Sequence, residues 1–70
     1  MPSYDPELIS TMRAALDDVM TQIPAEQSTL AVKVHLAEFI LKAAADGQTS
    51  YGALLAAATS QIQTVLSLLT

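Results

Sequence analysis

The stretch "STLAVKVHLAEFILKAAADG", from Ser28 to Gly47, decides the fold, because its apolar residues recur at helical spacing over nearly its whole length. One stripe alternates at intervals of four and three: Leu30, Val34, Ala37, Leu41 and Ala44. Residues at this spacing share one face of an α-helix. Ser28 lies close to the expected start, and Gly47 supplies the left-handed residue that commonly ends a helix. We therefore predict a helix at about residues 27–46.

A second apolar stripe runs along the same predicted helix at intervals of four, three and four: Val32, Leu36, Phe39 and Ala43. We assign the stripe that begins at Leu30 to the core of the domain, so the second stripe faces the opposite side. A contiguous apolar surface of this kind marks an interface. We therefore expect these four residues to contact a partner, either a second copy or a helix of another protein. The alternative is that two neighbouring helices cover both stripes internally.

The segments on either side of this helix have the same periodicity. The first begins with Asp5, Pro6 and Glu7, which suit a helix N-terminus. It ends before Pro24, and its apolar stripe is Ile9, Met12, Leu16, Val19 and Ile23. The last begins after a cap at Thr49 or Ser50, and its stripe is Leu55, Ala58, Ile62, Val65 and Leu69. We predict a single all-α domain over residues 1–70, a three-helix up-down-up bundle with helices at about 5–23, 27–46 and 50–69, and we expect it to be dimeric.

Composition favours a partner. Hydrophobic residues make up 51% of the 70-residue chain and charged residues only 14%, whereas ordinary domains have about 25% charged residues. A chain of this size buries only about 60% of the surface that its unfolded form exposes, so its core is marginal. The sequence has no cysteine, which excludes disulfides, thiolate catalysis and zinc sites built on sulfur. Association with a partner is the remaining way to stabilise the domain.

Charge and hydropathy argue against two classes of partner. The net charge is −4, and the basic residues are Arg13, Lys33 and Lys42, too few for the clustered cations that a nucleic acid or an anionic membrane requires. No apolar run reaches the roughly 18 residues of a membrane span. The N-terminal "MPSYDPEL" lacks the basic and apolar regions of a signal peptide. We expect a cytoplasmic protein that binds neither nucleic acid nor membrane.

The segment "ADGQTSYG", from Ala45 to Gly52, resembles a calcium-binding loop only superficially. When Gly47 is aligned with the turn glycine of such a loop, three of the main ligand positions fall on Lys42, Ala44 and Ala53. None of these side chains supplies a suitable oxygen. We interpret the segment as the end of one helix, a turn and the start of the next.

Candidate catalytic groups are isolated. His35 is the single histidine, and its spacing to Glu38 is the reverse of the Glu-x-x-His pattern that di-iron bundles use twice. We interpret His35, Glu38 and Lys42 as a solvated stripe. Asp17 and Asp18 are adjacent, so their side chains diverge by about 100° on a helix and cannot act on one bond. We expect no enzyme activity, no metal and no cofactor.

Two hypotheses for function remain. The first is a non-enzymatic protein–protein interaction or homodimerisation module that uses Val32, Leu36, Phe39 and Ala43. The alternative is a small helix-turn-helix regulator that places the predicted helix 50–69 on DNA. No Lys or Arg lies between Ser50 and Thr70, so such a helix would contact phosphates poorly.

The interpretation of His35 as a surface residue leads to a first prediction. His35→Ala should shift the melting temperature by no more than a few degrees, because the substitution removes neither a core side chain nor a metal ligand. Addition of zinc should leave the melting temperature of the wild type unchanged, as measured by circular dichroism. A zinc-dependent rise that disappears in His35→Ala would contradict this interpretation.

Overall fold

The computed structural model describes residues 5–69, and four α-helices follow one another along this part of the chain. They are α1 (Pro6–Met20), α2 (Leu30–Ala45), α3 (Tyr51–Thr59) and α4 (Ile62–Leu69), with a single 3-10 turn, η1 (Ala25–Gln27), between α1 and α2. No strand occurs within residues 5–69, which confirms the predicted all-α class. Residues 1–4, part of the segment examined for a signal peptide, lie outside the described residues, as does Thr70.

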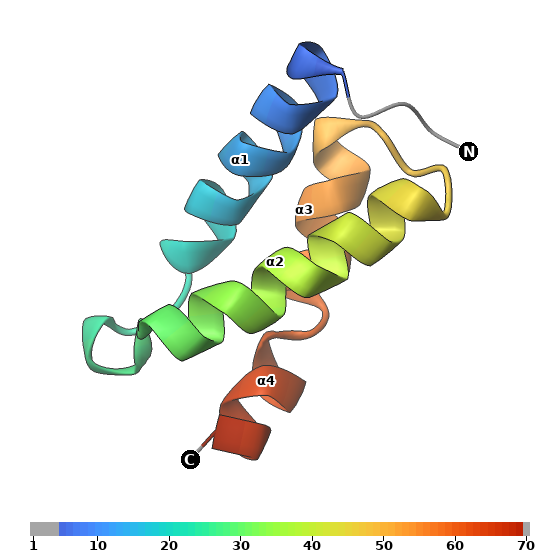
Figure 1. Cartoon of the computed structure of the whole chain (residues 1–70). Coiled ribbons are helices and arrows are strands. Elements are labelled where there is room, and N and C mark those ends of the chain that lie inside the picture. The colour runs from blue at the N-terminus through green and yellow to red at the C-terminus, as the bar shows by residue number, and fades with distance from the viewer. Residues whose placement is uncertain (1–4, 70) are drawn as a thin grey trace.

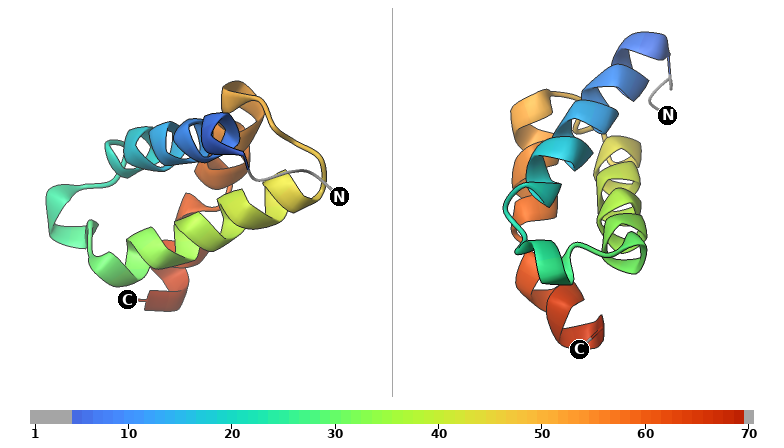
Figure 2. Two further views of the ribbon diagram at one scale, coloured as in Figure 1. Left: turned by 45° about the horizontal axis from the view of Figure 1, so that its top comes forward. Right: turned by 90° about the vertical axis from the view of Figure 1, so that its left-hand side faces the viewer.

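The first three helices pack against one another (Figure 1). α1 and α2 run in opposite directions, and α3 lies against both of them on one side of the pair (Figure 2). α4 extends from the end of α3 and packs against α2. The packing of three helices against one another is therefore as predicted.

Side-chain caps begin the first three helices. The Asp5 carboxylate accepts a hydrogen bond from the backbone N–H of Leu8 at 2.8 Å, with Pro6 at the first helical position. The Ser50 hydroxyl accepts from the N–H of Ala53 at 3.2 Å in the same way. α2 is capped by Thr29, whose hydroxyl accepts from Val32, rather than by Ser28. α2 thus begins three residues later than predicted.

Gly47 ends α2 with a Schellman turn. The glycine has a φ of 99°, a left-handed conformation that strains other residues. Its N–H donates to the carbonyl of Ala44, and the N–H of Gln48 donates to the carbonyl of Ala43, both at 3.0 Å. These two bonds satisfy carbonyls that the helix itself leaves unpaired. The sequence prediction for this end of α2 is confirmed.

The predicted helix 50–69 is interrupted at Ser60 and Gln61. The Ser60 hydroxyl donates to the carbonyl of Ala57 at 2.9 Å, and the N–H of Gln61 donates to Ala58 in a tighter, 3-10-like bond. The carbonyl of Gln61 then accepts from Val65 and begins α4. The prediction of one continuous helix over residues 50–69 was therefore wrong, because the serine side chain offers the backbone a local hydrogen bond that competes with the helical pattern.

α1 also ends earlier than predicted, at Met20, although Ile23 beyond it is still buried.

The core uses the opposite face of α2 from the one predicted. Five of the larger side chains are almost completely buried: Val19, Leu36, Ile40, Leu54 and Val65. Val32 and Ala43 are buried with them, whereas Leu30 is 76% exposed and Val34 and Leu41 are about half exposed. The assignment of the stripe to the core was therefore wrong for Leu30, Val34 and Leu41, because α1, α3 and α4 pack around the side of α2 that Leu36 occupies. Ala44, at the end of the same stripe, is buried as predicted.

This reversal leads to a second prediction, which compares two leucines on α2. Leu36→Ala should lower the free energy of unfolding by about 2–5 kcal/mol, because it leaves a cavity in the core. Leu30→Ala should change it by less than about 1 kcal/mol, because the Leu30 side chain is mostly in solvent. Urea denaturation monitored by circular dichroism measures both values. A larger loss for Leu30→Ala than for Leu36→Ala would contradict the observed orientation of α2.

Candidate interaction surface

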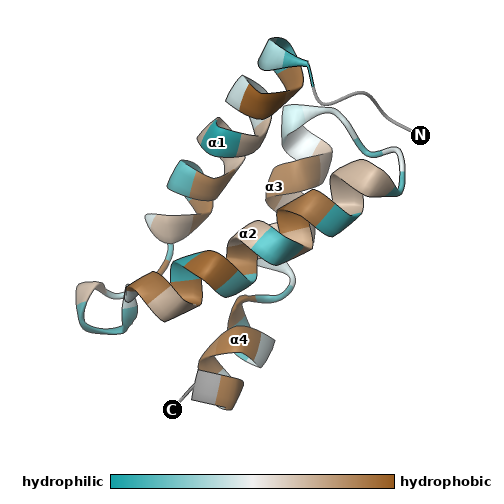
Figure 3. Ribbon diagram, in the orientation of Figure 1, coloured by the Kyte–Doolittle hydropathy of each residue, from teal (hydrophilic) through white to brown (hydrophobic). Residues whose placement is uncertain are grey.

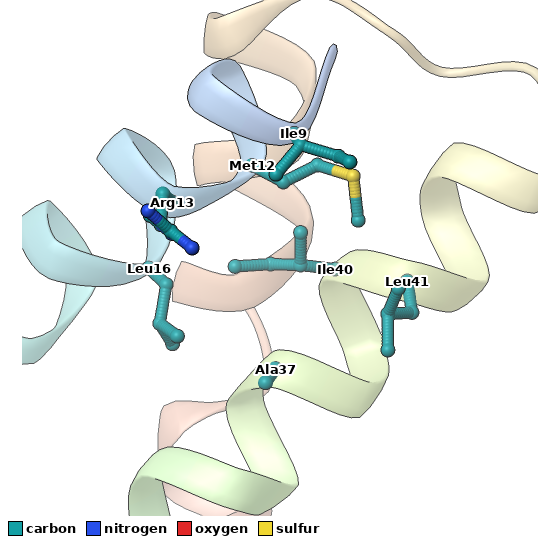
Figure 4. Close-up of a pocket in the computed structure, with 7 residues that line it drawn as sticks. All are labelled: Ile9, Met12, Arg13, Leu16, Ala37, Ile40 and Leu41. Atoms are coloured by element: carbon teal, nitrogen blue, oxygen red, sulfur yellow. The ribbon is translucent and has the colours of Figure 1, made fainter. Parts of the chain in front are cut away.

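An apolar groove of about 340 Å³ lies between α1 and α2 (Figure 4). Its lining comes from four residues of α1 and three of α2: Ile9, Met12, Arg13, Leu16, Ala37, Ile40 and Leu41. Ile40 is 2% exposed and forms the floor, while Ile9 and Leu41 lie on opposite rims (Figure 4). Arg13 contributes the one charged side chain of the lining. We call this hollow the α1–α2 groove.

The groove is open because α3 supports α1 and α2 from one side only. On the other side, Met12 and Leu16 reach partway toward α2 and are half-buried. The α2 residue opposite them is Ala37, whose methyl group is too small to fill the space (Figure 4). The hollow therefore results from a small side chain opposite larger ones, with no further helix of the described chain to cover it.

The apolar surface continues beyond the groove along α2. Leu41 and Val34 are 47% and 48% exposed, and Leu30 is the most exposed large hydrophobic residue of the described chain. These three side chains share one face with Ala37 at helical spacing. Figure 3 shows that most of α2 is hydrophobic, with hydrophilic positions at only a few points. We call the groove together with Leu30 and Val34 the α1–α2 face.

Charged side chains flank the α1–α2 face on both helices. Arg13 and Asp17 are exposed on α1, one helical turn apart. Glu38 and Lys42 are exposed on α2 at the same spacing. Glu38 lies one turn from both Val34 and Leu41, so its carboxylate borders the exposed apolar stripe. The face thus has an apolar centre and charged edges, which is the usual anatomy of a protein interface.

The residues predicted to contact a partner lie elsewhere. Val32 and Leu36 are 3% and 0% exposed, and Ala43 is 8% exposed, so these side chains belong to the core. Phe39 is half-buried against the same core and lines a second hollow of about 270 Å³, together with Ala57 and Gln61 among others. The expectation that these four residues form a free outer face was therefore wrong. The alternative, that neighbouring helices cover them, is the observed arrangement.

The polar groups singled out in the sequence do not converge. His35 is half-buried on α2, and Asp17 and Asp18 are exposed on α1. Asp18 accepts a hydrogen bond from the Tyr51 hydroxyl, which links α1 to the start of α3. Among the described residues, no group of three or more His, Asp or Glu side chains is placed to hold a metal ion.

A signal in the sequence identifies the correct core face of α2. Leu36 and Ile40 each stand two positions from Glu38, which places them about 200° away from its charge around the helix. The exposed residues Val34 and Leu41 instead stand four and three positions from Glu38, on the same side as the charge. The sequence analysis counted apolar spacings and did not weigh the position of this charge, so it missed the α1–α2 groove.

The chain matches no known protein family, no curated protein and no solved structure in the comparisons made. Within residues 5–69, no helix combines the length and the apolar character that a bilayer-spanning segment needs. The class that the fold and surface define is a small all-helical domain with an uncovered apolar groove between α1 and α2.

The position of Phe39 leads to a third prediction. Phe39→Glu should lower the free energy of unfolding by about 2–4 kcal/mol, because the substitution removes aromatic packing and places a carboxylate against the core. Thermal unfolding by circular dichroism at low protein concentration measures this effect in the monomer. If the variant keeps the melting temperature of the wild type, Phe39 lies on a free surface after all.

Proposed function

We propose that this protein is a non-enzymatic interaction module that self-associates through the α1–α2 face. The observation that carries the proposal is the α1–α2 groove, whose apolar lining extends into the exposed side chains of Leu30 and Val34. Monomeric proteins rarely expose a continuous apolar surface together with a groove of this kind unless it serves binding. As part of the same proposal, we place the protein in the cytoplasm.

The size of the core supports the proposal. Three of the fully buried residues are alanines, Ala15, Ala44 and Ala58, which contribute little apolar area. No aromatic side chain of the described chain is fully buried. A second copy on the α1–α2 face would remove Ile9, Leu41 and their apolar neighbours from water, and burial stabilises by about 25 cal/mol per Å². Dimerisation would thus add the apolar burial that a 70-residue chain lacks.

DNA binding receives less support. The helix-turn-helix alternative requires a recognition helix in the region of α3 and α4, but the chain carries no Lys or Arg from Ser50 onward. The interruption at Ser60 and Gln61 also leaves α3 only nine residues long. Phosphate contacts supply most of the affinity of such proteins for DNA, so we favour the interaction module.

A leucine pair tests the proposed function and forms the fourth prediction. In sedimentation equilibrium, the wild type should dimerise reversibly, and Leu41→Glu should abolish the dimer, because a carboxylate in the centre of the α1–α2 face would lose its hydration without a partner. Leu68→Glu is the matched control. Leu68 is 72% exposed but lies on α4, so this variant should dimerise like the wild type.

Circular dichroism of both variants separates dissociation from unfolding, since Leu41 is exposed enough that the monomer should keep its helical content. A wild type that stays monomeric at millimolar concentration would overturn self-association. Loss of the dimer in Leu68→Glu but not in Leu41→Glu would move the interface away from the α1–α2 face.

A further inference from the structure

We infer that the α1–α2 groove of a single copy binds a single-chain anionic amphiphile, with its alkyl chain on the apolar lining and a carboxylate head, as in a fatty acid, on Arg13. This inference goes beyond the proposed function, because α1 and α2 of one chain supply the residues that line the groove. It follows from the size of the groove, the apolar character of its walls and the cation at its edge.

The groove has the size of a small-molecule site. Its volume of about 340 Å³ lies at the lower end of the range of about 300–1,000 Å³ that such sites occupy. Ile9 and Leu16 stand two helical turns apart, so the groove extends about 10 Å along α1. If a methylene group takes up roughly the 30 Å³ of a water molecule, the groove holds on the order of ten of them. An alkyl chain of about this length therefore fits.

The walls of the groove suit a hydrocarbon chain. Figure 4 shows Ile40 near the centre, with Met12 and Leu16 on the α1 side and Ala37 and Leu41 on the α2 side. These side chains offer dispersion contacts and removal from water but no hydrogen bonds. The flexible thioether of Met12 can adapt to the shape of a bound chain. A sugar or a nucleotide would lose its hydrogen bonds to water on such walls, so the lining favours an alkyl chain.

Arg13 supplies the site for the head of the ligand. Its side chain lies at the α1 edge of the groove, between Met12 and Leu16 (Figure 4). The guanidinium forms no hydrogen bond or ion pair with the described part of the chain, so its N–H groups are available to a ligand. These N–H groups form a planar fork that matches the two oxygens of a carboxylate. The groove thus combines an alkyl-chain site with a neighbouring anion site.

The other charges of the molecule make a preference for an anion informative. Asp17 and Glu38 are exposed near the groove, but neither side chain lines it. The net charge of the chain is −4, so general electrostatic attraction favours a cationic amphiphile over an anionic one. Preferential binding of the anion therefore requires a specific contact with Arg13.

A titration with decanoate tests the inference and forms the fifth prediction. Decanoate, kept below its critical micelle concentration, should bind saturably and shift the NMR signals of the Met12 methyl group and of the other groove residues. The dissociation constant should be on the order of 1 mM, weaker than the roughly 0.1 mM of a longer myristoyl chain on a membrane. Dilute protein keeps the measurement on single copies, and circular dichroism verifies that the helices persist.

Three variants locate the ligand. Arg13→Gln should raise the dissociation constant for decanoate about tenfold, because the charge-assisted hydrogen bonds are lost. Lys42→Gln is the matched control. It removes the same charge from a residue that lines the second hollow, beside Phe39, and not the groove, so it should change the constant by less than about twofold. Ala37→Leu should abolish binding, because the larger side chain fills the space between the two helices.

A second ligand tests the head group. Decyltrimethylammonium has the same alkyl chain with a cationic head, so it should bind the wild type more weakly than decanoate does. Arg13→Glu should reverse this order, because the carboxylate at position 13 then attracts the cation. Equal or tighter binding of the cation to the wild type would overturn the role of Arg13. Undiminished binding of decanoate to Ala37→Leu would place the ligand outside the groove and overturn the inference.

The results separate this inference from self-association. If the Met12 signal shifts with rising protein concentration but decanoate causes no shift, the occupant of the groove is a second copy. That outcome would overturn the inference while supporting the proposed function. A wild type that remains monomeric but binds decanoate in the manner described would support the inference and overturn self-association.

Discussion

The packing of α2 against three other helices is the constraint on which the rest of the structure depends. α1, α3 and α4 all contact α2, and Leu36, near its middle, is completely buried. Because the chain is short, one helix must supply much of the core to all its neighbours at once. This requirement explains why α2 is apolar over more than half of its circumference and carries few charged residues.

The same constraint produces the α1–α2 groove. A helix that turns its Leu36 side toward three neighbours leaves its Leu41 side without cover, and α3 occupies only one side of the α1–α2 pair. The apolar character of the exposed side is more than the fold of the monomer requires. A second copy that binds there would cover the exposed side of the α1–α2 pair with its own pair. Four helices would then pack together, and each α2 would gain a neighbour on its remaining apolar side.

The local signals of the sequence were reliable, whereas the global choice between two faces was not. Asp5, Gly47 and Ser50 act through bonds to residues within a few positions, so the sequence alone identifies these helix ends. The orientation of α2 depends on which side three separate helices cover, and apolar spacing is nearly equal for the two stripes. For the same reason, Val32, Leu36, Phe39 and Ala43 were assigned to an interface although they form part of the core.

The interruption at Ser60 was missed for a different reason. It depends on one hydrogen bond from the Ser60 hydroxyl to the carbonyl of Ala57, and many helices that contain serine lack such a bond.

The two glycines of the chain differ in the substitutions that their positions tolerate. A Cβ atom added to either Gly47 or Gly52 would meet no other atom within 4 Å, so crowding restricts neither position. Only Gly47 has a positive φ, and there the cost of a side chain arises from the backbone alone, which asparagine tolerates better than β-branched residues do. Gly52 lies inside α3, where alanine fits and lowers the entropy of the unfolded chain. In related sequences we therefore expect glycine or asparagine at the α2–α3 corner, and alanine as a common replacement at the second position of α3.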